Sequence, residues 1–211
     1  MSEYRSKKLL KSYGVPVTRE ALVQSEVEAV LAAETIGYPV ALKACSPELM
    51  HKSETGCMAL NLKNDTEVHE AYSRIIEAVD IDLEGVLVQE MVPGQRELVL
   101  GLNRDPQFGP CVMLGLGGVL TEVLNDTAFR VAPFGIIEAR DMIEELGCRS
   151  MLEHFRGQAA ADIDTICRSL VALGKLGIDH GVISEIDINP MIINPAGNLK
   201  AADALVVLGK E

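Results

Sequence analysis

Three polar side chains alternate with isoleucines in "SEIDINP", near the C-terminal end of this 211-residue chain. The polar residues are Glu185, Asp187 and Asn189. Successive side chains of a β-strand point to opposite faces, so a strand here would place all three on one face and the isoleucines on the other. The spacing therefore predicts a strand with an oxygen-rich face.

The turn that follows this strand predicts a fourth member of the group. The turn "NPAGN" is centred on Ala196, and symmetric pairing about that centre sets Asn189 opposite Asp203. Directly opposed residues share a face, with Cβ atoms ~5 Å apart. Two oxygens aimed at one point, with Asp187 one step along, suit Mg²⁺ that carries a nucleotide phosphate. A solvated polar face on an edge hairpin fits the pattern too, although an unpartnered carboxylate in the apolar stretch "AADALVVL" would be costly.

Cations and glycines elsewhere are candidates for holding phosphate. Lys43 ends the apolar run "PVALK", where a buried ammonium needs an anion; a strand-end lysine that reaches water is the alternative. Glycine lets backbone N–H groups approach phosphate, so Gly115, Gly117 and Gly118 form either a phosphate cradle or a tight turn. Arg130 in "NDTAFRVAP" is a candidate anion ligand, with a surface ion pair as the ordinary alternative.

His51 lies in "SPELMHKSETGC", just before a glycine turn. A neutral imidazole is nucleophilic near pH 7 and accepts phosphoryl groups. A surface histidine without a role would have the same local sequence, so these residues alone leave both interpretations open.

Strands and helices alternate along the chain, which is typical of an α+β (α/β) fold. The break at "VQEMVPG" predicts two lobes, residues 1–91 with a loop at 46–57 and residues 92–211 with a hairpin at 183–207. Capping residues and apolar patterns predict helices at 3–14, 25–37, 64–79, 138–146 and 160–177, and strands at 38–44, 57–63, 85–92, 97–104, 110–124 (broken at its glycines), 181–193 and 198–208.

Composition excludes several classes of protein. With 48% hydrophobic and 24% charged residues the chain is expected to be globular. A net charge of −12 and an aromatic content of 4% argue against a nucleic-acid partner. No apolar run approaches the ~20 residues of a membrane span. The five scattered cysteines suggest reduced thiols in a cytoplasmic protein.

Several motifs together resemble a known family. The stretches "LLKSYGVPV", "IGYPVALKACSPELMHKSETG", "VLVQEMVPGQRELVLGLNRDPQFGPCVMLGLGGVLTEVLNDTAFRVAP" and "EIDINPMIINPAGNLKAADALVVL" are similar to the ATP-grasp subunit of ADP-forming acyl-CoA (acetate–CoA) synthetases. The chain also resembles, more distantly, the β subunit of succinyl-CoA synthetase. The resemblance covers nearly the whole chain and keeps the order of the motifs.

The resemblance implies an ATP-grasp fold with ATP or ADP between two lobes. It places Lys43 at the nucleotide phosphates and the backbone of Glu90, Met91 and Val92 at adenine. It also implies that Asn189 and Asp203 bind the metal, that Asp187 lies close to the transferred phosphate and that His51 accepts it. One departure is Cys57, which stands after Gly56 where the family usually has a second glycine.

The implied reaction is acyl-CoA + ADP + phosphate ⇌ carboxylate + CoA + ATP, with Mg²⁺ and a phosphohistidine intermediate. The resemblance implies that CoA binding belongs to a separate α subunit or a fused domain, because nothing in the chain resembles a CoA-binding part. A CoA-binding α subunit in a hetero-oligomer is the expected partner. Three other functions remain open from the sequence: an ATP-grasp ligase that joins a carboxylate to an amine without a histidine, a non-catalytic nucleotide sensor, and a plain scaffold with no nucleotide affinity.

Overall fold

The computed structural model describes residues 1–49, 56–117, 126–154 and 157–209. The chain divides into two compact units, Met1–Arg5 with Thr18–Met91 and Ser6–Val17 with Val92–Glu211. The change of unit between Met91 and Val92 falls at the Pro-Gly break in the sequence. Residues 6–17 differ from the sequence expectation, because they group with the second unit although they precede most of the first.

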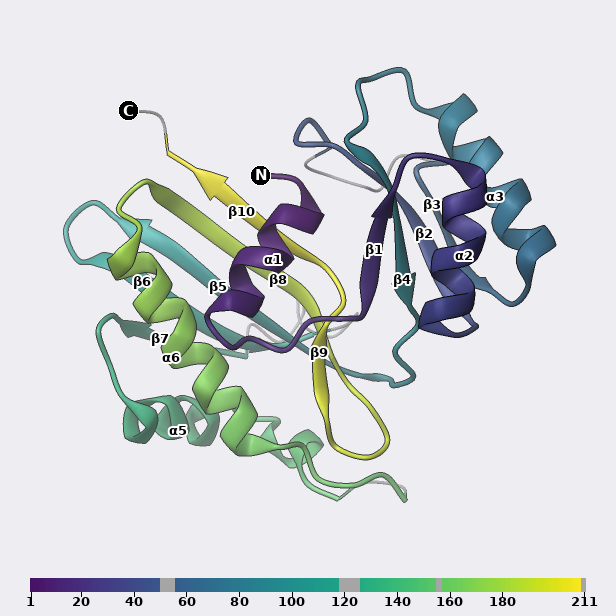
Figure 1. Ribbon diagram of the computed structural model, residues 1–211. Helices are drawn as coiled ribbons and strands as arrows, with labels where there is room; N and C mark the ends of the chain where they lie inside the picture. The colour runs from purple at the N-terminus through teal and green to yellow at the C-terminus, as the bar shows by residue number, and fades with distance from the viewer. Residues whose placement is uncertain (50–55, 118–125, 155–156, 210–211) are drawn as a thin grey trace. The chain divides into compact units, whose positions relative to one another are not determined.

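The first unit is a four-stranded antiparallel sheet with two helices. The strand order is β1-β4-β2-β3, and β2 is buried along its whole length. Helices α2 and α3 lie on one side of this sheet (Figure 1) and complete its apolar core. The bounds are β1 Glu20–Val23, α2 Glu26–Ile36, β2 Val40–Cys45, β3 Met58–Leu62, α3 Asp65–Ala78 and β4 Gly85–Glu90.

The helix ends in this unit follow from their capping residues. Ser25 caps α2 by accepting a hydrogen bond from the Glu28 N–H at 3.3 Å, and Gly37 ends the helix with φ +93°. The Glu28 carboxylate accepts from the Gln24 N–H, one residue before the Ser25 N–H that a capping box would use. Asn64 caps α3 by accepting from the Glu67 N–H at 3.0 Å.

The second unit is built on a six-stranded antiparallel sheet. Its order is β10-β8-β5-β6-β7, with β9 paired to β8. Figure 1 shows α1 and α6 crossing the same face of this sheet. The bounds are α1 Glu3–Ser12 (from Ser6 onward in this unit), β5 Arg96–Asp105, β6 Gly109–Leu116, β7 Thr127–Val131, α5 Ile136–Glu145, the 3₁₀ helix η1 Arg149–Leu152, α6 Ile163–Asp179, β8 Ile183–Ile193, β9 Leu199–Ala201 and β10 Ala204–Leu208.

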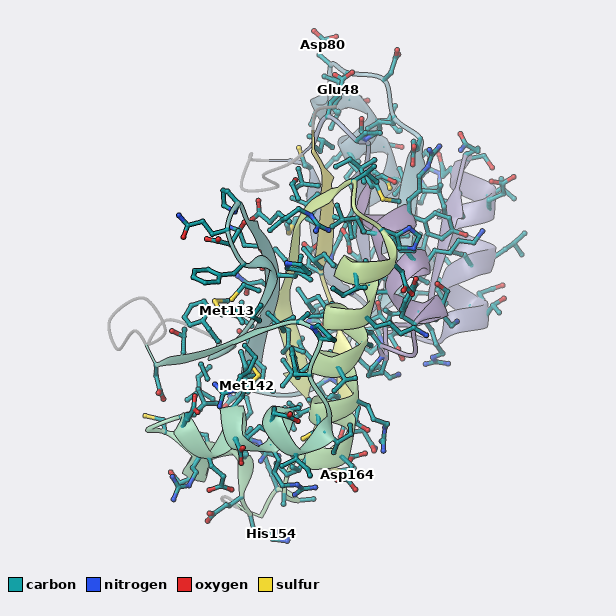
Figure 2. All side chains as sticks on the ribbon, turned by 90° about the vertical axis from the view of Figure 1, so that its left-hand side faces the viewer. Glu48, Asp80, Met113, Met142, His154 and Asp164 are labelled. Atoms are coloured by element: carbon teal, nitrogen blue, oxygen red, sulfur yellow. The ribbon has the colours of Figure 1, made fainter. Side chains whose placement is uncertain are left out.

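The two faces of the larger sheet are covered differently. Leu100, Leu102, Ile186 and Ile188 are buried on the face that α6 covers. Met113 projects from the opposite face (Figure 2). Among the described residues, no helix is long and apolar enough to cross a membrane.

Close approach of α6 to the sheet depends on glycine. A Cβ at Gly177 would lie 2.6 Å from Leu102 Cδ1 and 2.8 Å from Pro110 Cβ, both well inside normal contact. Glycine inside a helix costs about 1 kcal/mol relative to alanine, so its presence here indicates that packing decides the residue.

We expect Gly177→Ala to lower the free energy of unfolding by about 1–3 kcal/mol, because overpacking outweighs the gain in helix propensity. Urea denaturation measures the change. Gly181→Ala is the matched control, since nothing lies within 4 Å of a Cβ at Gly181. Equal or higher stability of the Gly177 variant would contradict the packing argument.

Candidate active site

The turn after β8 sets the register of the hairpin. The Asn194 side-chain oxygen accepts from the N–H groups of Ala196 and Asn198, each at 3.0 Å. Gly197 completes the turn with φ +88°, and a Cβ there would collide with the carbonyl oxygen of Ala160. Asn194 and Gly197 therefore hold the turn in one conformation.

The predicted pairing about Ala196 is confirmed. Met191 lies opposite Ala201 on one side of a short break in the ladder, and Asp187 opposite Leu205 on the other. Within the break the Asn189 N–H donates to the Asp203 carbonyl oxygen at 3.2 Å. Asn189 and Asp203 therefore stand opposite one another, as the sequence predicts.

Buried and exposed side chains alternate along β8, as the sequence predicts. Ile186 and Ile188 are buried, whereas Glu185 and Asn189 are exposed and Asp187 is half-buried. Burial raises the pKa of Asp187, and the charges of Glu185 and Asp203 raise it further. Three carboxylates thus repel one another on this face, which is an environment that a cation stabilises.

A cavity of about 440 Å³ opens on the same face of the sheet. Glu185 and Asp187 line it together with Gly101, Asn103 and Met113. Figure 2 shows Met113 on the side of the sheet away from α6. The acidic residues therefore border a space large enough for part of a ligand.

The donor set fits a magnesium ion that is shared with a ligand. In the described part of the chain, no group of three or more His, Cys, Asp and Glu side chains is arranged to hold a metal ion by itself. Asn189 and Asp203 contribute an amide and a carboxylate oxygen. Mg²⁺ prefers oxygen ligands and is usually bound by few protein groups, with water and phosphate oxygens completing its shell.

Lys43 is buried rather than reaching water. Its side chain is 7% exposed, and Nζ lies 2.9 Å from Glu3 Oε1, whose side chain is 2% exposed. The expectation that a buried ammonium here needs an anion is therefore met within the chain by Glu3.

Two of the three glycines proposed for a phosphate cradle serve the sheet instead. Gly115 is part of β6 and pairs with both Val99 and Thr127. The Gly117 N–H donates to the Glu97 carbonyl oxygen at 2.7 Å, and a Cβ at Gly117 would lie 2.7 Å from Glu97 Cβ. Close packing against β5 therefore accounts for Gly117, while Gly118 lies outside the described residues.

Arg130 is not on the acidic face. It pairs with Val112, whose side chain faces α6, and its guanidinium binds both carboxylate oxygens of Glu145 on α5. The hydrogen bond from Arg130 also lowers the pKa of Glu145. The surface ion pair, which was the alternative interpretation, is what the structure contains.

The adenine segment predicted at residues 90–92 has two of its amides already in use. The Glu90 N–H donates to the Arg19 carbonyl oxygen at 3.0 Å, and the Met91 N–H to that of Pro39 at 3.2 Å. The Glu90 carboxylate is bound by the Arg19 backbone N–H and Nε. A base at this segment would therefore use carbonyl oxygens or the amide of Val92.

His51 lies outside the described residues, so its role stays a prediction. Sequence reasoning placed Glu185 on the oxygen-rich face without giving it a role, and it did not connect Glu3 with Lys43 at all. Glu185 shares the period-two pattern of Asp187, which was a usable signal. Glu3 is 40 positions from Lys43, and no local pattern connects them.

A family model described as an ATP-grasp domain matches residues 1–208. The β subunit of acetate–CoA ligase [ADP-forming] I from Pyrococcus furiosus is 40% identical over 98% of this chain and 90% of its own length. The β subunit of succinate–CoA ligase [ADP-forming] from Natronomonas pharaonis is 30% identical over 100% of this chain and 56% of its own.

This chain is also similar to a solved structure. Acetyl-coenzyme A synthetase 1 from Ca. Korarchaeum cryptofilum matches with a TM-score of 0.85 and 43% identity, over 98% of this chain and 91% of that chain. That protein is in complex with coenzyme A and Mg-AMPPCP, with its phosphohistidine segment pointing towards the nucleotide binding site. The fold and the matched motifs define an ATP-grasp protein. Within that class, this chain belongs to the family of β subunits of ADP-forming acid–CoA ligases.

We expect Asp187→Asn to stabilise the protein at pH 7 in the absence of metal and nucleotide. A carboxyl whose pKa is raised by folding binds more protons folded than unfolded, so it destabilises the fold as pH rises. The difference between variant and wild type should appear above the ordinary aspartate range, ~pH 4, and vanish below it.

Thermal unfolding between pH 3 and pH 8 measures this difference. Asp80→Asn, which removes a charge from an exposed position (Figure 2), is the control and should stay within ~0.5 kcal/mol of wild type at every pH. An Asp187 variant less stable than wild type at pH 7 would contradict the assignment of Asp187 to a repulsive cluster.

Proposed function

We propose that this chain is the nucleotide-binding subunit of an ADP-forming acid–CoA ligase, which interconverts acyl-CoA, ADP and phosphate with carboxylate, CoA and ATP. The observation that carries the proposal is the opposed pair Asn189 and Asp203, held by the Asn189 N–H bond at 3.2 Å. The relatives named as β subunits support the same reaction.

The proposal assigns the CoA half of the reaction to a separate α subunit. The relative from Pyrococcus furiosus is itself a β subunit, and this chain covers 90% of it. We infer a hetero-oligomer in which the α subunit binds CoA and this chain binds ADP or ATP.

His51 carries the phosphoryl group between the two halves in this proposal. Its neutral ring nitrogen attacks the γ-phosphorus of ATP, the bond to the bridging oxygen breaks, ADP leaves, and the phosphoryl group stays on the nitrogen. The reverse step regenerates ATP. A phosphohistidine segment in the related Korarchaeum enzyme supports this role.

The remaining residues act by position and charge, which is how phosphoryl transfer is mainly catalysed. Asn189 and Asp203 would hold Mg²⁺, which when bound neutralises charge on the phosphates. Lys43 contacts phosphate oxygens, and Asp187 lies beside the phosphate that is transferred. Glu90 to Val92 provide backbone contacts to the base.

Incubation of the purified chain with γ-labelled Mg-ATP should give an acid-labile, base-stable label. We expect His51→Ala to abolish the label, because the nucleophile is lost. His69→Ala is the control, since His69 is exposed on α3 and paired with Glu26, and it should label as wild type does. Undiminished labelling of the His51 variant would remove His51 from the mechanism.

Turnover and labelling also distinguish the proposed function from two alternatives, a carboxylate–amine ligase and a nucleotide sensor. A carboxylate–amine ligase would turn over with His51→Ala at the wild-type rate, and a nucleotide sensor would bind Mg-ADP without any label. Either result would contradict the proposal.

We expect Asp203→Asn to weaken Mg-ADP binding at least ~10-fold, since loss of a metal ligand reduces metal affinity by that order or more. Isothermal titration with ADP, in magnesium and in EDTA, measures it. The variant and the wild type should agree in EDTA. A variant that binds Mg-ADP as tightly as wild type would show that the metal lies elsewhere.

A further inference from the structure

The Glu3–Lys43 ion pair has no role in the function proposed above, although it contains the lysine assigned to phosphate. Nζ and Oε1 are 2.9 Å apart, and both side chains are almost fully buried. We propose that Glu3 is a positioning residue, which holds the Lys43 ammonium where it meets the nucleotide phosphates. The inference rests on the proposed function.

Lys43 projects from the face of its sheet opposite α2 and α3. Val40, Leu42 and Ala44 belong to the core shared with α2 and α3. Because side chains alternate along a strand, Lys43 points to the other face. A four-carbon stem on such a face has many rotamers, and a fixed carboxylate selects among them.

Glu3 is itself held firmly in the first turn of α1. The Ser2 hydroxyl donates to Glu84 Oε2 at 2.6 Å, and the Arg5 guanidinium binds Glu84 Oε1 at 2.8 Å. The Glu84 N–H in turn donates to the Cys45 carbonyl oxygen at 2.7 Å, at the end of β2. The residues on both sides of Glu3 are therefore bonded to Glu84, whose backbone is bonded to the strand that carries Lys43.

Because the Glu3 carboxylate is held in place, it fixes the orientation of the Lys43 ammonium. It does not need to be displaced for phosphate to bind. An ammonium has three N–H donors, so a bond to Glu3 is compatible with a simultaneous bond to phosphate. Without Glu3, Lys43 would lose one of the bonds that orient its ammonium, and it would meet phosphate less often.

Isothermal titration with two ligands, Mg-ADP and adenosine, separates positioning from a purely structural role. We expect Glu3→Gln to weaken Mg-ADP binding ~10-fold and to leave adenosine binding within ~2-fold, since adenosine has no phosphate for Lys43. In a Lys43→Met background, Glu3→Gln should cause no further loss, because coupled residues are not additive.

Asp164→Asn is the control for the loss of one negative charge, since Asp164 forms an exposed ion pair with Arg140 (Figure 2). It should bind both ligands as wild type does. If Glu3→Gln fails to fold, Glu3→Asp keeps the charge on a shorter stem and should also weaken Mg-ADP selectively.

Three results would overturn the inference: unchanged or tighter Mg-ADP binding by either Glu3 variant, equal weakening for both ligands, or a further loss in the Lys43→Met background. Unchanged Mg-ADP binding by Lys43→Met alone would be a different failure. It would remove Lys43 from the phosphate site and thus overturn part of the proposed function as well.

Discussion

The register of β8 is the constraint on which the second unit depends. β8 pairs with β5, β9 and β10, so its alignment decides which side chains face α6 and which face the cavity. A slip of one residue would move Asp187 into the apolar layer and Ile186 or Ile188 onto the acidic face. The turn at Asn194 and Gly197 excludes that slip, and the apolar layer under α6 excludes it a second time.

In the first unit, buried charges are balanced before any ligand arrives. Lys43 is paired with Glu3, and the Glu90 carboxylate with Arg19, within the same unit. Leaving one such charge unpaired would cost far more than an exposed ion pair contributes. Both pairs involve the N-terminal segments, residues 1–5 and 18–19, which explains why these segments group with the sheet that they cover.

Local sequence patterns were sufficient to predict the faces of β8, the register of its hairpin and several helix ends. The alternation in "SEIDINP" and the symmetric turn predicted the faces of β8 and the opposition of Asn189 and Asp203. Ser25 and Asn64 marked helix starts through side-chain oxygens that accept from backbone N–H groups, and Gly37 marked a helix end. Strand β1 was missed because its four residues are too short for a pattern, and β7 because it is an edge strand with three exposed positions.

Contacts distant in sequence could not be predicted in this way. "GLGG" suggested a phosphate cradle or a tight turn, but pairing with Val99 and Thr127 keeps Gly115 in a strand, and Gly117 is packed against Glu97. Arg130 was ambiguous until β7 was placed, because one residue of register decides whether it meets Glu145 or the acidic face. Glu3 and Lys43 meet only because residues 1–5 fold into the same unit as β2.

The charges of the site also determine how a nucleotide can bind. A polyphosphate is strongly anionic, the chain carries a net charge of −12, and the face around Asp187 is acidic. Lys43 adds little net charge, because Glu3 neutralises it at 2.9 Å. In the proposed function the protein side chains therefore position the phosphates, while the metal ion supplies the positive charge that neutralises them. In the proposed function the nucleotide would accordingly bind together with magnesium, since the cation removes the repulsion between the phosphates and the acidic face.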